Sequence, residues 1–154
     1  MSSLKPGDPA PDFELKDQNG ETVRLSEFRS HSAVVLYFYP KDDTGGCTKE
    51  ACAFREQLAA FRGLAAEVLG VSSDSEESHH AFAAKYNLPF RLLSDPGGRV
   101  RKLYGVQATL GIIPGRKTFV IDREGILRAT FTSQFKPVEH IRQALAALAQ
   151  AALT

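Results

Sequence analysis

The stretch AVVLYFYPKDDTGGCTKEACAFRE, residues 33–56, contains an apolar run, a polar turn and a helical pattern in direct succession. The run AVVLYFY is rich in β-branched and aromatic residues, which predicts a central strand buried on both faces. The turn PKDDTGG separates this strand from a helix predicted over residues 47–62. A strand that leads into a helix is typical of α/β domains, so this stretch sets the expected fold class.

The rest of the chain continues the alternation of strands and helices. Asp74 and Glu77 form a capping-box pattern that predicts a helix ending near Tyr86. The other predicted elements are a hairpin in FELKDQNGETVRL (13–25), a strand in AEVLGVSS (66–73), a strand in FRLLSDP (90–96), a short helix in GGRVRKLYGV (97–106), a hairpin in KTFVIDREGILRATF (117–131) and a helix from Pro137 to about Leu148. Together they predict one layered α/β domain over residues 1–154.

Composition is that of an ordinary globular domain, with 43% hydrophobic and 24% charged residues. The 19 basic and 18 acidic residues nearly cancel, which argues against nucleic acid or an anionic membrane as the main partner. The beginning of the chain has no apolar stretch of signal-peptide length, so a cytoplasmic location is expected. The two cysteines are too few to form a zinc site alone, and no metal is expected.

The two cysteines, Cys47 and Cys52, occupy different faces of the predicted helix. At about 100° per residue, Cys47 shares an apolar stripe with Ala51, Phe54 and Leu58, whereas Cys52 lies about 140° away. Five helical residues separate the two Cα atoms by roughly 8 to 9 Å, but a disulfide needs about 4.4 to 6.8 Å. A bond between these cysteines therefore requires the start of the helix to unwind.

Cys47 follows directly on two glycines in the first predicted helical turn, where backbone N–H groups stabilise an anion. Gly45 and Gly46 let a small ligand approach the backbone closely. Thr44 can cap the helix or turn its hydroxyl toward the sulfur. Lowering a thiol pKa from about 8.5 by about 2.5 units takes about 3.4 kcal/mol, and a helix terminus supplies roughly 0.3 to 2 kcal/mol. A nearby cation is therefore expected.

The spacing P-x-x-x-T-x-x-C of Pro40, Thr44 and Cys47 closely resembles the active-site pattern of the peroxiredoxins, thiol peroxidases with a thioredoxin-like fold. Cys52, five residues after Cys47, is similar to the second cysteine of the peroxiredoxin Q subgroup, also called bacterioferritin comigratory proteins. GRKTFVID resembles the strand that carries the family's active-site arginine, here Arg116. The resemblance extends over roughly residues 5–148, including GDPAPDFELKDQNGETVRLSEF.

This resemblance implies a role for each matching residue. Cys47 would be the peroxidatic nucleophile, and Cys52 the resolving thiol of an internal disulfide. Thr44 would hydrogen-bond the sulfur and the peroxide, Pro40 would shape the pocket, and Arg116 would be the expected cation. The implied fold is a central mixed sheet flanked by helices, with an N-terminal hairpin extension.

The resemblance also implies substrates and partners. Hydrogen peroxide and small organic hydroperoxides would bind at Gly46, Thr44 and Arg116, and thioredoxin or a similar dithiol would be the reductant. No metal, haem or flavin is implied, and resolution within one chain is compatible with a monomer. The subgroup commonly has proline directly after the threonine, whereas this chain has Gly45. We expect this glycine to ease local unfolding of the loop.

The residues alone leave other interpretations open. Cys47 could be a small buried apolar residue, Cys52 incidental and Arg116 solvated. A thiol–disulfide oxidoreductase usually has C-x-x-C, which this chain lacks, and a redox-switched binding protein or chaperone could use the same unwinding helix. Several polar residues are expected on solvated faces: His31, His79, His80, His140, Arg99, Arg101 and Lys102. Leu110, Ile112 and Ile113 could form an apolar collar near the pocket, a subunit contact or ordinary packing.

Overall fold

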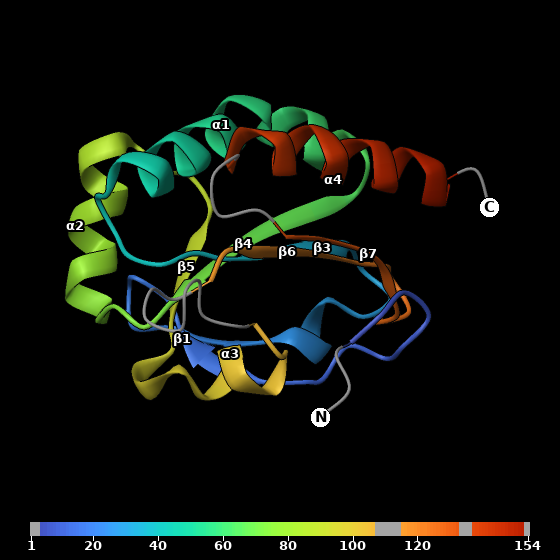
Figure 1. Ribbon diagram of the computed structural model, residues 1–154, viewed down its shortest axis with the longest axis horizontal. Coiled ribbons are helices and arrows are strands. Elements are labelled where there is room, and N and C mark those ends of the chain that lie inside the picture. The colour runs from blue at the N-terminus through green and yellow to red at the C-terminus, as the bar shows by residue number, and fades with distance from the viewer. Residues whose placement is uncertain (1–3, 107–114, 133–136, 153–154) are drawn as a thin grey trace.

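A seven-stranded sheet in the order β2-β1-β5-β4-β3-β6-β7 forms the centre of the protein in a computed structural model (Figure 1). The structure describes residues 4–106, 115–132 and 137–152. The strands are β1 (Glu14–Lys16), β2 (Thr22–Arg24), β3 (Ala33–Phe38), β4 (Ala66–Ser72), β5 (Arg91–Ser94), β6 (Lys117–Ile121) and β7 (Leu127–Thr132). The helices are α1 (Gly45–Gly63), α2 (Glu76–Tyr86), α3 (Arg99–Leu103) and α4 (Pro137–Ala152), with short 3-10 turns at η1 (Leu25–Phe28) and η2 (Pro96–Gly98).

The sheet is mixed, as the resemblance implies. Strands β3, β4 and β5 run parallel, whereas β6 pairs antiparallel with β3, and β1 pairs antiparallel with β5. All six residues of β3 are buried, because β3 lies between β4 and β6 and is covered on both faces. The apolar run that predicted a central strand is therefore confirmed.

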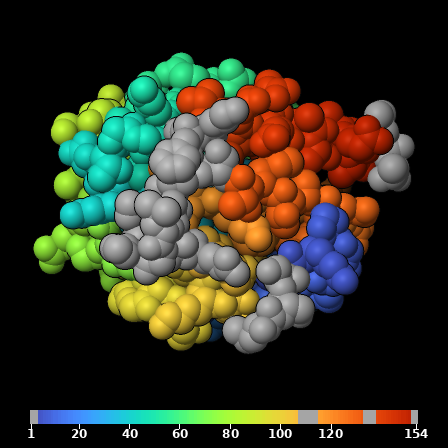
Figure 2. All heavy atoms as spheres, viewed as in Figure 1, coloured from blue at the N-terminus to red at the C-terminus, as the bar shows by residue number. Residues whose placement is uncertain are grey.

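Alternate residues of β3 enter two separate cores. Val35 and Tyr37 pack with Phe54 of α1 on one face, and Leu36 and Phe38 pack on the other face with apolar residues of α3 and the N-terminal segment. Figure 1 shows α1 and α4 together above the sheet, with α3 and the N-terminal segment below it. Figure 2 shows the same layers as a continuous surface, with α4 in red beside α1 in green and α3 in yellow at the opposite edge.

The N-terminus of α2 differs from the predicted capping box. Ser75 is the N-cap, and its hydroxyl accepts the Ser78 N–H at 3.1 Å. Asp74 lies outside the helix, where its carboxylate accepts the Ser72 hydroxyl at 2.6 Å and the Asp42 N–H at 2.8 Å. The capping box is therefore wrong by one residue, because the Asp74 side chain is occupied by the loop that follows β3.

The N-terminal hairpin extension is confirmed as the β1–β2 pair, which lies at one edge of the sheet within the predicted stretch 13–25. At the opposite edge, β6 and β7 form the second predicted hairpin. Gly20 and Gly125 have φ of +78° and +83°, conformations that favour glycine. No helix within the described ranges combines the length and apolar character that crossing a membrane would need.

Candidate active site

Cys47 lies in the first turn of α1, at the point where the chain has just left the central strand. Thr44 occupies the N-cap position with extended backbone, and the helix begins at Gly45. The first backbone N–H groups of a helix have no acceptor within it, so they leave partial positive charge around a side chain at this position. The Cys47 side chain is 2% exposed. A buried thiol thus lies where the backbone favours an anion.

The two cysteines face different surroundings, as the helical wheel predicts. Cys47 is buried together with Ala51, Phe54 and the other residues of the apolar stripe, whereas Cys52 is partly exposed. Both cysteines are free thiols, and α1 is continuous from Gly45 to Gly63. In this state the pair is separated by an intact helix.

Arg116 supplies the cation that the sequence predicts beside the thiol. It directly precedes β6, whose last ladder pair with β3 is Phe38–Lys117, and it is 3% exposed. Its Nη2 atom donates to Cys47 Sγ at 3.4 Å. Burial opposes the Arg116 charge, but the charges of Glu50 and Cys47 raise the pKa of the guanidinium. Glu50 and Cys47 therefore keep the Arg116 guanidinium charged despite its burial.

Glu50 is a site residue that the sequence reasoning missed. It lies three residues after Cys47 on α1, is fully buried, and its Oε1 accepts a hydrogen bond from Arg116 Nη1. Burial raises the pKa of Glu50 to about 8, although Arg116 acts in the opposite direction. Residues three apart on a helix share a face, so an acid at this position relative to Cys47 was the available signal.

His140 of α4 lies behind Glu50, which corrects the expectation of a solvated histidine. The side chain is fully buried, and its Nδ1 lies 2.7 Å from the Thr118 hydroxyl and 3.8 Å from Glu50 Oε2. The expectation fails because His140 lies on the face of α4 that packs against α1 and β6. His31 and His80 are exposed, as predicted.

The loop before α1 is anchored through Asp42. This carboxylate is 7% exposed and accepts the Tyr39 hydroxyl at 2.6 Å and the Ser78 hydroxyl at 2.8 Å. His79 Nδ1 lies 2.7 Å from the same carboxylate, and its Nε2 lies 2.9 Å from the Leu93 carbonyl. His79 is therefore buried and fully paired, which corrects the expectation that it is solvated.

Asp43 and Arg55 make a second set of contacts to α2. The Asp43 carboxylate accepts Lys85 Nζ and the Tyr86 hydroxyl, each at 2.8 Å. Arg55, three residues after Cys52, donates through Nη1 to the Tyr86 carbonyl at 2.5 Å. The chain is thus attached to the last turn of α2 both before and after the two cysteines.

The remaining predicted site residues surround the start of α1. Thr44 is exposed, and its hydroxyl donates to the Lys41 carbonyl at 3.0 Å, so in this state it neither caps the helix nor hydrogen-bonds Cys47. Pro40 and Gly46 are partly buried beside the same turn. The predicted apolar collar of Leu110, Ile112 and Ile113 lies outside the described residues.

Arg101 of α3 is buried, which corrects its predicted solvated position, whereas Arg99 and Lys102 are exposed as predicted. Its guanidinium donates to the carbonyls of Tyr39 and Gly115. The reason for the error is that α3 spans only Arg99–Leu103, too short for its periodicity to indicate a buried face.

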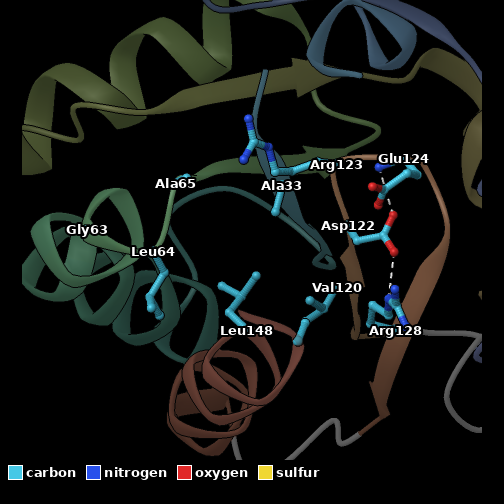
Figure 3. Close-up of a pocket in the computed structure, with 11 residues that line it drawn as sticks. Ala33, Gly63, Leu64, Ala65, Val120, Asp122, Arg123, Glu124, Arg128 and Leu148 are labelled. Atoms are coloured by element: carbon cyan, nitrogen blue, oxygen red, sulfur yellow. Dashed lines mark hydrogen bonds and ion pairs between the residues drawn. The ribbon is translucent and has the colours of Figure 1, made fainter. Parts of the chain in front are cut away.

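A separate cavity of about 730 Å³ lies at the other end of α1, as Figure 3 shows. It is lined by Leu64, Val120 and Leu148, with Asp122 and Arg128 at its edge. Asp122 and Arg128 are joined by a hydrogen bond of 2.6 Å. From Cys47 to Leu64 the helix rises by roughly 25 Å, so this cavity takes no part in chemistry at the thiol.

Comparison with known proteins identifies the family of the chain. A family model described as the AhpC/TSA family matches residues 6–130. The chain is 52% identical over 146 residues to a chloroplastic peroxiredoxin Q of Sedum lineare, covering 94% of this chain and 78% of that protein. It is also similar to the crystal structure of peroxidoxin BcpB from Mycobacterium tuberculosis (TM-score 0.88, 40% identity, 96% and 97% of the two chains). A PrxQ mutant from Xylella fastidiosa has a TM-score of 0.90 and 31% identity, with 99% of each chain covered.

Proposed function

The chain belongs to the AhpC/TSA family, within its peroxiredoxin Q group, and on this premise we propose that Cys47 is the peroxidatic nucleophile and Cys52 the resolving thiol. Peroxiredoxins are thiol peroxidases with a thioredoxin-like fold, so the chain is a peroxidase that takes a hydroperoxide substrate and a thiol reductant. The proposal adds the residues, the internal disulfide and the identity of the reductant.

The observation that carries the proposal is the Arg116–Cys47 contact at 3.4 Å in a buried first helical turn. In the first step, the Cys47 thiolate attacks one peroxide oxygen and the O–O bond breaks. The sulfur is oxidised to a sulfenic acid, and the leaving oxygen takes a proton to become water or an alcohol. Arg116 and the backbone N–H of Gly46 donate toward the oxygens as charge develops, and the Thr44 hydroxyl turns inward to do the same.

In the second step, the Cys52 thiol attacks the sulfenic acid sulfur, an S–S bond forms, and water leaves with the two protons. This step requires the first turns of α1 to unwind, because five helical residues hold the Cα atoms roughly 8 to 9 Å apart. The partly exposed position of Cys52 supports its role as the thiol that moves. Pro40 shields the sulfenic acid until the turn opens.

In the third step, thioredoxin or a similar dithiol reduces the disulfide by thiol–disulfide exchange and is itself oxidised. Hydrogen peroxide and small organic hydroperoxides are the proposed substrates, since Gly45 and Gly46 let a small ligand approach the backbone at the start of α1. A monomer suffices for this cycle, because both thiols belong to one chain. A cytoplasmic location is also proposed, although curated plant relatives are named chloroplastic.

Mass spectrometry after one equivalent of hydrogen peroxide tests the two cysteine roles. The wild-type protein should lose two hydrogens through an internal bridge between Cys47 and Cys52. The Cys52→Ser variant should instead gain one oxygen on Cys47. The Cys47→Ser variant should show neither an internal bridge nor an oxygen adduct. An oxygen adduct on Cys52 in the Cys47→Ser variant would reverse the assignment.

Coupled turnover with thioredoxin, thioredoxin reductase and NADPH separates an enzyme from a redox switch. Steady peroxide consumption that disappears in Cys47→Ser supports the enzyme. A single oxidation event without turnover, with every dithiol reductant supplied, would favour the redox-switched binding protein.

A further inference from the structure

Arg101 connects the two segments that meet at Cys47. Its side chain is 9% exposed and comes from α3, on the opposite face of the sheet from α1. Its Nη1 donates to the Gly115 carbonyl at 2.7 Å, and its Nη2 donates to the Tyr39 carbonyl at 2.8 Å. The planar fork of a guanidinium can bind two acceptors at fixed separation, which a lysine ammonium cannot reproduce.

The two carbonyls lie just beyond the end of the β3–β6 ladder. The last ladder pair is Phe38–Lys117, so the carbonyls of Tyr39 and Gly115 lie beyond the β3–β6 pairing, whereas the Tyr39 N–H still donates to the Val71 carbonyl of β4 at 3.0 Å. Tyr39 leads into the loop that precedes α1 and Cys47, and Gly115 directly precedes the arginine that contacts the thiol. Arg101 thus holds these two carbonyls together just beyond the β3–β6 ladder, where the segments that carry Cys47 and Arg116 leave the sheet.

The Arg101 charge is buried without a carboxylate partner among the ion pairs of the described residues. The nearby Asp95 carboxylate accepts the backbone N–H groups of Val100 and Arg101 instead. Burial lowers the pKa of the Arg101 guanidinium, and the charges of Asp95 and Cys47 oppose that shift. The Arg101 and Cys47 side chains are therefore close enough for their charges to interact.

We propose that Arg101 is a positioning residue of the peroxidatic site, which fixes Arg116 and the loop before α1 in register and adds a second positive charge near the thiol. The inference rests on the proposed function, because it assumes that Cys47 is the nucleophile. The groups that face this region from the surrounding elements are Tyr37 of β3, Glu50 of α1, Arg116 before β6, His140 of α4 and Asp95 before α3.

The test compares Arg101→Met and Arg101→Lys, each in a Cys52→Ser background that leaves Cys47 as the only thiol. Lys102→Met is the matched control, because it removes one positive charge from an exposed position of the same short helix. Two quantities are measured for each protein. One is the midpoint of the thiolate ultraviolet absorbance as pH is varied, and the other is the second-order rate of reaction with hydrogen peroxide across the same pH range.

Arg101→Met should move the titration midpoint upward by about half a pH unit or more, which lowers the thiolate fraction about threefold below the midpoint. Its peroxide reaction should slow at every pH, and most at low pH. Arg101→Lys keeps the charge but satisfies only one carbonyl, so it should restore the midpoint while the rate plateau at high pH stays reduced. Lys102→Met should match the parent protein in both quantities.

An Arg101→Met variant with the parent midpoint and rate would overturn the inference, as would an equal loss in Lys102→Met. If Arg101→Met does not fold by circular dichroism, Arg101→Lys decides, because a full rate plateau in that variant would exclude the positioning role. A parent protein that does not react with peroxide refutes the proposed function instead. The midpoint comparison needs no turnover and tests Arg101 independently.

Discussion

Replacing Gly45 with proline should stabilise the folded protein and slow the formation of the proposed disulfide between Cys47 and Cys52. Gly45 is the first residue of α1, a position where proline is favoured because its missing N–H has no helical acceptor to lose. The preceding residue, Thr44, has φ −102° and ψ 159°, in the extended region that a following proline requires. A Cβ atom at Gly45 would meet no atom within 4 Å. The substitution therefore introduces no clash.

The size of the effect follows from the entropy of the unfolded chain. A compatible proline substitution stabilises a protein by about 0.4 to 1 kcal/mol, which corresponds to a rise in Tm of about 1 to 4 °C for a domain of this length. The same restriction disfavours the unwound first turn. The population that lets Cys52 reach Cys47 should therefore fall by about two- to fivefold, and disulfide formation should slow by the same factor.

Thermal unfolding measures the first effect, and single-turnover stopped-flow kinetics measures the second, with the attack on peroxide and the later disulfide formation resolved as separate phases. The matched control is Glu76→Pro at the first residue of α2, which follows the extended Ser75 and lies away from the cysteines. The control should leave the disulfide phase unchanged. A Gly45→Pro protein that is more stable but forms its disulfide at the parent rate would refute unwinding of the first turn as the step that limits resolution.

Three further substitutions test the buried polar groups. Burial raises the pKa of Glu50 from 4.5 to about 8, so the folded protein keeps the Glu50 proton to a higher pH than the unfolded chain does. The contribution of Glu50 to the free energy of unfolding is therefore full below about pH 4.5 and is lost as the pH rises toward 8. Glu50→Gln should remove this pH dependence of the free energy of unfolding, as measured by denaturant titrations between these pH values. Arg116→Lys should slow the reaction with peroxide by about 10²- to 10³-fold in stopped-flow measurements, since a preorganised donor is lost, and a rate within threefold of the parent would contradict this role. His79→Leu removes the histidine partner of the buried Asp42 carboxylate and should cost about 3 to 5 kcal/mol in the free energy of unfolding, whereas the exposed His80→Leu should change it by less than about 0.5 kcal/mol.

The sequence alone predicted the parts of the fold that depend on local patterns. The apolar run at β3, the two glycine turns and the face of α1 that carries Cys47 all follow from composition and periodicity along a single segment. Arg116 was predicted from a motif, and the expected cation agrees with its contact to Cys47. Local patterns determine which elements form, and these elements place the thiol at a helix start.

The polar residues that the sequence misplaced depend on contacts between distant segments. Glu50 and His140 are separated by most of the chain, and they are buried because α4 packs against α1. His79 is buried because its two ring nitrogens are paired with the carboxylate of Asp42 and the carbonyl of Leu93, which belong to two other segments. Arg101 donates to two carbonyls that the pairing of β3 with β6 brings close together. A polar side chain can be buried where other segments supply its hydrogen-bond partners, and the sequence of a single segment does not show which groups these are.

The attachment of the chain to the last turn of α2 on both sides of the cysteines limits how far the helix start can travel. Asp43 contacts Lys85 and Tyr86, and Arg55 donates to the Tyr86 carbonyl. Both ends of the segment that contains the two cysteines are therefore attached to the last turn of α2. We expect the melted turn to explore a small volume and to meet its partner sulfur at high local concentration. After reduction, we expect these contacts to return the segment to its helical form while the rest of the domain stays folded.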